Sequence, residues 1–215
     1  DVYIQVVMAY DDGGNLVHTG VYVGDDLDTY LDAAKASRAQ NITVFEQGVD
    51  KIVAVMQADE FRATWVANKA VYRTRMAMAD GGELLVIAPG VKRFGEQPEV
   101  DDLIRKYGYI SKSEVLELYA HEEDMQEIPH GTAHLVHGSS EGRFTIRYAP
   151  GGLTKEEIES VGYEYMDVNE ALERYNPEVL NDGWNTLPDG EKVYFISTPS
   201  AGLWATRAKL EERDV

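Results

Sequence analysis

Three basic side chains recur along one edge of a predicted helix and together have the chemistry of an anion site. The helix is predicted over Arg62–Ala79, and Arg62, Lys69 and Arg73 follow one another at i, i+7 and i+11. Helical side chains lean toward the amino end of their helix, so these cations and the helix dipole point to the same mouth, beside Trp65. That arrangement suits a carboxylate. The alternative is a solvated cationic face that pairs with nearby carboxylates, and the residues alone favour this alternative.

The segment Gly138–Gly142 matches G-x-S-x-G, the pattern that presents a nucleophilic serine on a strand-to-helix turn in α/β hydrolases. Those enzymes also need a histidine later in the chain. Here Arg143–Tyr148 alternates like a strand and no histidine follows His137, so the sequence argues against a serine hydrolase. A tight loop whose backbone amides and Arg143 contact a ligand fits the segment better than a hydrolase does, and a plain β-turn is favoured over both.

Four of the five histidines fall within a short stretch and invite a metal interpretation: His121, His130, His134 and His137. However, a strand is predicted over Ala133–His137, which would turn His134 and His137 to opposite faces. The chain also lacks H-E-x-x-H, and we predict no metal site. His137, at the end of that strand, is the best single candidate for a functional imidazole, although the residues favour a structural histidine.

Composition narrows the classes of partner. The 215 residues include 38 acidic and 20 basic ones, a formal net charge of −18, which argues against nucleic acid and against an anionic membrane. The sequence contains no cysteine, no apolar run of the ~18 residues that a membrane span needs and no signal peptide. It also has no P-loop and no G-x-G-x-x-G, which disfavours a nicotinamide dehydrogenase. We expect a cytoplasmic protein and, because the chain opens at Asp1 on a strand, a piece of a longer one.

The first half of the chain predicts the elements that position the cationic edge. A hairpin and a helix capped by Asp25 or Asp26 are followed by a β–α–β succession, which implies parallel strands. The predicted elements are the strands Val2–Ala9 and Leu16–Val23 around a turn at Asp11–Gly14, the helix Leu27–Ala39, the strands Ile42–Phe45 and Lys51–Met56, the helix Arg62–Ala79, a turn at Gly81-Gly82 and the strand Glu83–Ala88.

The second half continues the alternation of helices and strands. The predicted elements are the helices Val100–Tyr107 and Ser113–Tyr119, the strands Ala133–His137 and Phe144–Tyr148, a helix from the Thr154–Glu157 capping box to Ser160, the helix Val168–Tyr175 and a last strand, Val193–Ser197. We predict an α/β fold with a doubly wound, mostly parallel sheet, helices on both faces and a β-hairpin at the N-terminus. Residues 1–215 are expected to form a single α/β domain with a looser region around Asp182–Asp189.

Several segments, in their order and spacing, resemble the C-terminal half of the nickel-pincer lactate racemase family. They read VYIQVVMAYDDGGNLVHTGVYVGD, VDKIVAVM, NKAVYRTRMAMADGGELLVIAPG and AHLVHGSSEGRF, and the resemblance covers most of the chain. It is strongest to homologues associated with racemases or epimerases of 2-hydroxy acids and sugar acids. It implies a two-domain enzyme of which this chain is the C-terminal half.

In that family the C-terminal domain orients the substrate from a Tyr-Gln-x-x-Lys helix. Lys69 stands in the lysine position of this motif, whereas Trp65 and Val66 replace the tyrosine and the glutamine. The lost amide implies a substrate other than lactate, namely a larger 2-hydroxy acid such as an aldonic or uronic acid. Arg62, His137 or Arg143 would supply further contacts to it.

The resemblance also implies a cofactor and a partner. In the family the N-terminal domain holds the nickel-pincer nucleotide and the acid–base histidines, and none of its motifs occurs here. The implied reaction is reversible transfer of the α-hydride to the cofactor, while the C-terminal domain clamps the carboxylate and excludes water. This chain would then supply no catalytic residue. The alternative hypothesis is a non-catalytic α/β module that binds a small anion or is structural.

Overall fold

The computed structural model describes residues 1–11, 13 and 15–212, and their contacts divide the chain into two compact units, Asp1–Thr43 and Val44–Val215. The sequence had predicted a single α/β domain over residues 1–215. In the first unit β1 (Tyr3–Tyr10) and β2 (Leu16–Gly24) form an antiparallel hairpin. The helix α1 (Leu27–Asn41) packs on the hairpin and is capped by Asp26, which accepts a hydrogen bond from the Thr29 amide at 2.7 Å. Hairpin and helix are as predicted; Asp12 and Gly14 of the predicted turn lie outside the described residues.

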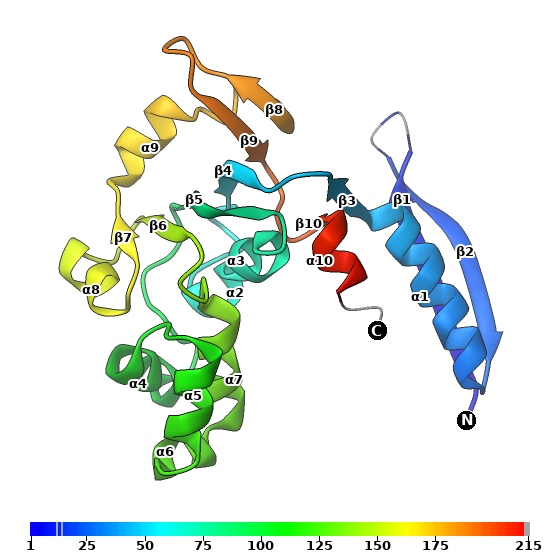
Figure 1. The fold of residues 1–215 in the computed structure, drawn as a ribbon, viewed down its shortest axis with the longest axis horizontal. Helices are drawn as coiled ribbons and strands as arrows, with labels where there is room; N and C mark the ends of the chain where they lie inside the picture. Colours follow the sequence, from blue (N-terminus) through cyan, green and yellow to red (C-terminus); the bar gives the residue numbers. More distant parts are fainter. Residues whose placement is uncertain (12, 14, 213–215) are drawn as a thin grey trace. The chain divides into compact units, whose positions relative to one another are not determined.

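The second unit is built on a six-stranded sheet (Figure 1). Its spatial order is β7-β6-β5-β4-β9-β8, and every pair is parallel except β8 with β9. The strands are β4 (Val49–Val55), β5 (Met78–Ala88), β6 (Thr145–Pro150), β7 (Glu164–Tyr165), β8 (Gly183–Thr186) and β9 (Lys192–Ile196). The short strands β3 (Ile42–Phe45) and β10 (Leu203–Thr206) lie outside this sheet.

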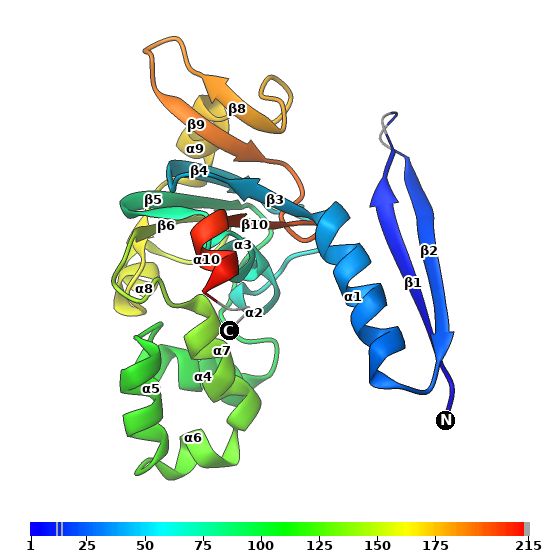
Figure 2. The ribbon, with the colours of Figure 1, turned by 45° about the vertical axis from the view of Figure 1, so that its right-hand side comes forward.

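Helices cover both faces of the sheet, which confirms the predicted doubly wound α/β class (Figure 2). Because side chains alternate along a strand, Ile52 and Leu84 enter one core while Val53 and Leu85 enter the other. The larger core lies under α2 (Thr64–Ala67), α3 (Lys69–Thr74), α4 (Pro98–Tyr107), α5 (Lys112–Tyr119), α6 (Glu123–Glu127), α7 (Pro129–Gly138) and α8 (Lys155–Ser160). The smaller core includes Ala171 of α9 (Val168–Arg174).

The helix predicted over Arg62–Ala79 is wrong in its length and continuity. The structure has a four-residue helix, α2, and a six-residue helix, α3, separated at Asn68. Asn68 is fully buried and donates from Nδ2 to the Tyr163 hydroxyl at 3.0 Å, a contact between residues 95 positions apart. The second helix ends at Thr74, whose hydroxyl donates back to the Ala70 carbonyl at 2.6 Å, a bond that weakens helices. Lys69 is therefore the first residue of α3 and does not lie two turns inside a helix.

The predicted turn at Gly81-Gly82 is a distortion within β5, and the chain does not reverse there. The register between β4 and β5 jumps from Val49 opposite Met78 to Lys51 opposite Glu83. Gly81 has a φ of 79°, which glycine adopts without strain. A Cβ at Gly82 would lie 2.7 Å from the Asp50 carbonyl oxygen, so β4 runs too close for any side chain.

The segment Ala133–His137 belongs to the helix α7, so the predicted strand is wrong. Pro129 begins this helix at a position that suits proline. On a helix His130, His134 and His137 share one face, whereas a strand would have separated His134 from His137. The residues of this segment alternate as in a strand, but their environment is set by aromatic rings of other elements. Trp65 contacts His130 and His134, and Tyr72 contacts His137.

The carboxyl-terminal part holds more structure than the sequence predicted. Val193–Ser197 was expected to be the last strand, but β10 and the helix α10 (Arg207–Glu211) follow β9. The region around Asp182–Asp189, expected to be looser, contains the edge strand β8. The predicted capping box is confirmed: the Glu157 amide donates to the Thr154 hydroxyl and the Thr154 amide to the Glu157 carboxylate. None of the described helices has the length and apolar character needed to cross a membrane.

Candidate functional site

The order of the sheet identifies the position where open α/β folds place their ligands. From β4 the chain continues to β5, β6 and β7 on one side, whereas β9 and β8 lie on the other side of β4. The order of the sheet therefore reverses at β4, and open α/β folds place ligands beyond the carboxyl ends of strands at such a point. The connections that follow β4 and β9 lie beside each other, since α3 contacts β10. Here Gln57 Nε2 donates to the Ser197 carbonyl oxygen at 3.1 Å and joins the two connections.

Two cations of α3 lie at this switch point. The chain returns from the carboxyl end of β4 to the amino end of β5, so α3 begins near the carboxyl edge, with Lys69 first and Arg73 one turn later. Arg73 donates from Nη1 to the Gly202 carbonyl oxygen at 2.9 Å, in the connection after β9, and its Nε is buried without a partner among the described residues. Lys69 places its ammonium 5.6 Å from the centre of the Phe61 ring.

Three further cations lie beyond the carboxyl ends of β4 and β5. The segments after these strands pair again through a parallel bridge between Ala63 and Arg93, and the Lys92 amide donates to the Arg62 carbonyl at 3.1 Å. Arg62, Lys92 and Arg93 are exposed. Lys92 and Arg93 were not among the site residues predicted from the sequence. The sequence feature that could have identified them is their position, because they come just after Ala88-Pro89-Gly90, at the end of a predicted buried strand.

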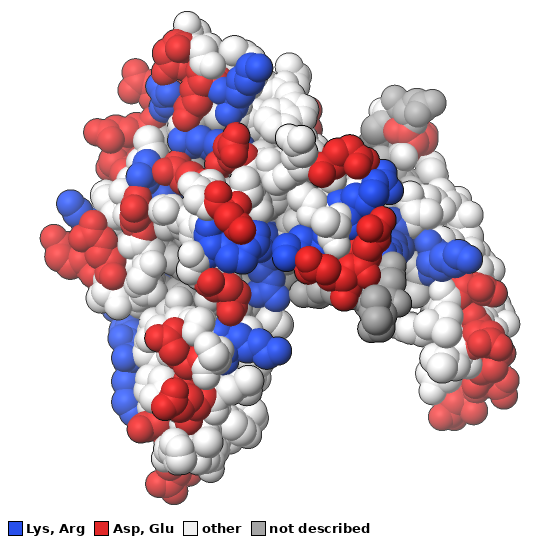
Figure 3. Space-filling view, viewed as in Figure 1, with Lys and Arg blue, Asp and Glu red and all other residues white. Residues whose placement is uncertain are grey.

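These five cations form no ion pair with any carboxylate in the described chain, although acidic residues outnumber basic ones almost two to one. Elsewhere in the same unit cations do pair: the Lys51 ammonium lies 2.8 Å from Glu83 and 2.9 Å from Glu191. Asp and Glu side chains are spread widely over the face shown in Figure 3. A local excess of unpaired cations in such a chain is an attractive site for an external anion.

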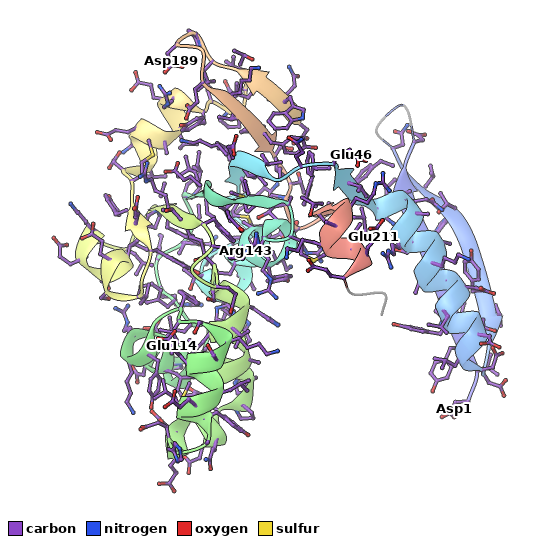
Figure 4. The ribbon with its side chains drawn as sticks, viewed as in Figure 1. Asp1, Glu46, Glu114, Arg143, Asp189 and Glu211 are labelled. Carbon is purple, nitrogen blue, oxygen red and sulfur yellow. The ribbon has the colours of Figure 1, made fainter. Side chains whose placement is uncertain are left out.

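Two predicted site residues lie at the other end of the sheet. Arg143, labelled in Figure 4, precedes β6. It donates to the Met78 carbonyl at 2.8 Å, to the Arg75 carbonyl at 3.3 Å and to the Asp80 carboxylate at 2.8 Å. It therefore fixes the start of β5. His137 stacks on Tyr72 at 5.5 Å, and burial together with the nearby Arg75 lowers its pKa. The structure does not bring Arg143 or His137 to the Lys69 side chain.

Trp65 and Val66 line a cavity of about 280 Å³ together with Glu96, Gln97, Val100 and His130. Trp65 contacts the His134 ring at 4.6 Å and the His130 ring at 5.9 Å between centroids. These are the positions where the family motif has tyrosine and glutamine. The indole is therefore supported by α7, and its apolar surface contributes to a cavity wall.

A buried hydrogen-bonded chain holds α2 under this cavity. The Thr64 hydroxyl lies 2.6 Å from the Tyr109 hydroxyl, which lies 3.1 Å from His134 Nε2. Burial, with a smaller effect from His137, lowers the pKa of His134 to about 3. The imidazole is therefore neutral at physiological pH and supports Trp65 as a structural group.

The described residues offer no ligand set for a metal. No three His, Asp or Glu side chains among them lie close enough together to hold an ion. The G-x-S-x-G segment follows the helix α7 and precedes the strand β6, the reverse of the order that a nucleophilic serine requires. Ser139, the residue before the serine of the motif, is buried, and its hydroxyl accepts a hydrogen bond from the Glu141 amide at 3.0 Å.

Comparison with known proteins shows a shared fold. No protein-family model and no curated protein sequence matches the chain. A crystal structure of a Thermotoga maritima protein from structural genomics matches 96% of the chain with a TM-score of 0.68 at 20% identity, over 49% of that protein. The lactate racemase apoprotein of Thermoanaerobacterium thermosaccharolyticum matches 94% of the chain with a TM-score of 0.62 at 12% identity, over 45% of that protein. The chain spans about half the length of each and has a lactate racemase-like fold.

Proposed function

We propose that this chain is the substrate-orienting, C-terminal half of a racemase or epimerase that acts on 2-hydroxy acids. The observation that carries the proposal is the cluster of five cations without carboxylate partners at the switch point of a lactate racemase-like fold. A 2-hydroxy acid presents a carboxylate next to the reacting carbon. A cation that holds this carboxylate fixes the position of that carbon.

Lys69 is the residue to which we assign the carboxylate. Lys69 is half-buried, and among the described residues the Phe61 ring is the only close partner of its ammonium. A partly desolvated cation binds a carboxylate more strongly than a fully exposed one. Arg73 is already bound to the Gly202 carbonyl, so its role is to hold the connection after β9 beside Lys69.

The exposed cations suit the far end of a substrate larger than lactate. Arg62, Lys92 and Arg93 lie further along the same edge of the sheet, where hydroxyl groups or a second anionic group of a sugar acid would meet them. The cavity wall formed by Trp65 provides apolar surface in place of the amide that the family motif carries.

The nickel-pincer nucleotide implied by the resemblance does not fit the residues described here, because they provide no metal-ligand cluster. We therefore assign the chain no step of the hydride transfer. Its own residues bind the acid, orient it and exclude water, and the chemistry belongs to a second domain.

A screen of 2-hydroxy acids tests the proposal. The full polypeptide that contains this chain, loaded with nickel and cofactor, is incubated in D2O with lactate and with aldonic and uronic acids. Loss of optical activity or inversion at C2 in one of these acids, absent when the cofactor is omitted, is the expected result. No change at C2 in any acid would contradict the assignment.

The second candidate is a module that binds a small anion without catalysis, and the same unpaired cations support it. Calorimetric titration of the chain with the same acids distinguishes the two. Binding that depends on Lys69, in a polypeptide that never inverts C2, would favour the binding module.

A further inference from the structure

The first unit exposes far more apolar surface than its size can tolerate. Most of the large apolar side chains that are exposed in the described chain belong to residues 1–43, although these residues make up a fifth of the sequence. Monomeric proteins rarely leave contiguous apolar patches larger than roughly 300–600 Å² in water. The concentration of such residues on one small unit indicates a covered surface.

The exposed residues share one face of the hairpin. Cross-strand partners point to the same side, and the pairs on this face are Ile4 with Val23, Val6 with Val21 and Tyr10 with Leu16. Their exposures run from 49% to 69%. The opposite face carries Val7 and Ala9, which are buried under α1. Within residues 1–43 the hairpin thus has one face covered by α1 and one apolar face that no other described residue of this unit covers.

The hairpin also has unpaired edges. It forms a sheet of only two strands in the described chain, and β1 and β2 are eight and nine residues long. Long apolar edge strands invite pairing with another chain segment, and a two-stranded sheet is marginally stable at best. A partner that supplies both strands and an apolar surface would satisfy the edges and the face together.

We propose that this hairpin face docks on a second folded domain of the same polypeptide, outside these 215 residues. Both structural neighbours contain about as much chain again as the part that this sequence matches, since the match covers 49% and 45% of them. The face carries no formal charge, which suits a permanent interface. A second copy of this chain is a poorer partner, because two chains of charge −18 repel each other. The proposal rests on the second domain that the proposed function also requires, but hydrogen exchange at residues 1–43 reports docking whether or not the polypeptide inverts a 2-hydroxy acid.

Hydrogen–deuterium exchange tests the docking. The 215-residue chain and the full polypeptide are compared amide by amide, with sedimentation velocity to establish the oligomeric state of each. The expected result is that amides of Tyr3–Tyr10 and Leu16–Gly24 exchange at least ~100-fold more slowly in the full polypeptide. Equal exchange in both proteins, or a natural polypeptide with no further folded domain, would overturn the proposal.

Two other outcomes would identify a different partner and also overturn it. Protection of the hairpin in a dimeric 215-residue chain would make a second copy the partner. Protection in a monomeric 215-residue chain would mean that residues 44–212 cover the face. These measurements use the unmodified sequence, so a substitution that prevents folding cannot affect them.

A pair of substitutions adds a check on the face itself. Val21→Lys places a charge at the centre of the face, whereas Val179→Lys places one at an equally exposed valine of the larger unit. We expect Val21→Lys to lower the Tm of the full polypeptide by roughly 5 °C and to speed hairpin exchange, with Val179→Lys without effect. Unchanged exchange in Val21→Lys would count against this face as the interface.

Discussion

Single side chains define the candidate site, and Lys69 carries the most specific role among them. Its spacing from Arg62 and Arg73 was visible in the sequence, and the structure leaves all three without a carboxylate partner among the described residues. Lys92 and Arg93 were not predicted because their proximity to Arg62 comes from the pairing of two segments thirty residues apart. Of the other predicted site residues, His137 lies in α7 against Tyr72, and Arg143 is bound to the start of β5.

We expect Lys69→Ala to lower kcat/KM of the full enzyme by ~10–100-fold, because a charged hydrogen bond contributes about 1.5–3 kcal/mol. The measurement is steady-state racemisation of the acid found in the screen. Lys192→Ala is the matched control, since Lys192 is also unpaired in the described chain but lies at the amino end of β9. Equal effects of the two substitutions would remove Lys69 from the site.

His134 makes the stability of the fold sensitive to acid. In the unfolded chain a histidine takes up a proton near pH 6.5, whereas in the fold burial lowers the pKa of His134 to about 3. Between these values the unfolded state binds more protons, so the stabilisation is complete above pH 6.5 and is lost as the pH falls toward 3. The free energy of unfolding should fall by about 2 kcal/mol from pH 6.5 to pH 5 through this group alone.

The variant His134→Gln separates this contribution from other acid effects. Glutamine cannot titrate but offers polar atoms to the Tyr109 hydroxyl. Urea unfolding at several pH values should therefore show a shallower loss of stability in His134→Gln than in the natural sequence. Parallel pH profiles for the two proteins would mean that His134 is not held neutral in the fold.

At the scale of elements, local patterns predicted strands better than the ends of helices. The strands β4 and β9 were found because their apolar runs are buried on both faces, and β6 was found from its alternating pattern. The break at Asn68 and the helical state of α7 were missed, because both depend on packing partners far away in sequence, Tyr163 for Asn68 and Trp65 for His134.

The two glycines of β5 should differ in what they tolerate. Gly81 has a positive φ but open space around a Cβ, whereas a Cβ at Gly82 meets the backbone of β4. We expect Gly81→Ala to cost about 1 kcal/mol of unfolding free energy through backbone strain and Gly82→Ala about 3 kcal/mol through the clash. Denaturant titration of both variants measures the difference. A larger loss in Gly81→Ala would contradict the strand pairing described here.

At the scale of the whole molecule, the excess of acidic residues opposes compactness. A net charge of −18 on 215 residues creates self-repulsion that salt screens. We expect the Tm at pH 7 to rise by roughly 3–8 °C between 20 mM and 500 mM NaCl. At pH 5, close to the isoelectric point of about 4.6, the same salt step should have a smaller effect. A Tm that falls with salt at pH 7 would show that ion pairs such as Lys51 with Glu83 outweigh the repulsion.

The sequence by itself determined the α/β class, the N-terminal hairpin and its helix, the buried strands and the chain's negative charge. These follow from periodicity, caps and composition, which act over a few residues. Three features follow only from the tertiary structure: Lys69 is the first residue of α3, five cations lie near the switch point of the sheet, and the chain divides into two units. Those outcomes depend on contacts between segments that are far apart in the sequence, such as Asn68 with Tyr163 and Ala63 with Arg93. Such contacts leave no pattern in the neighbouring residues from which they could be predicted.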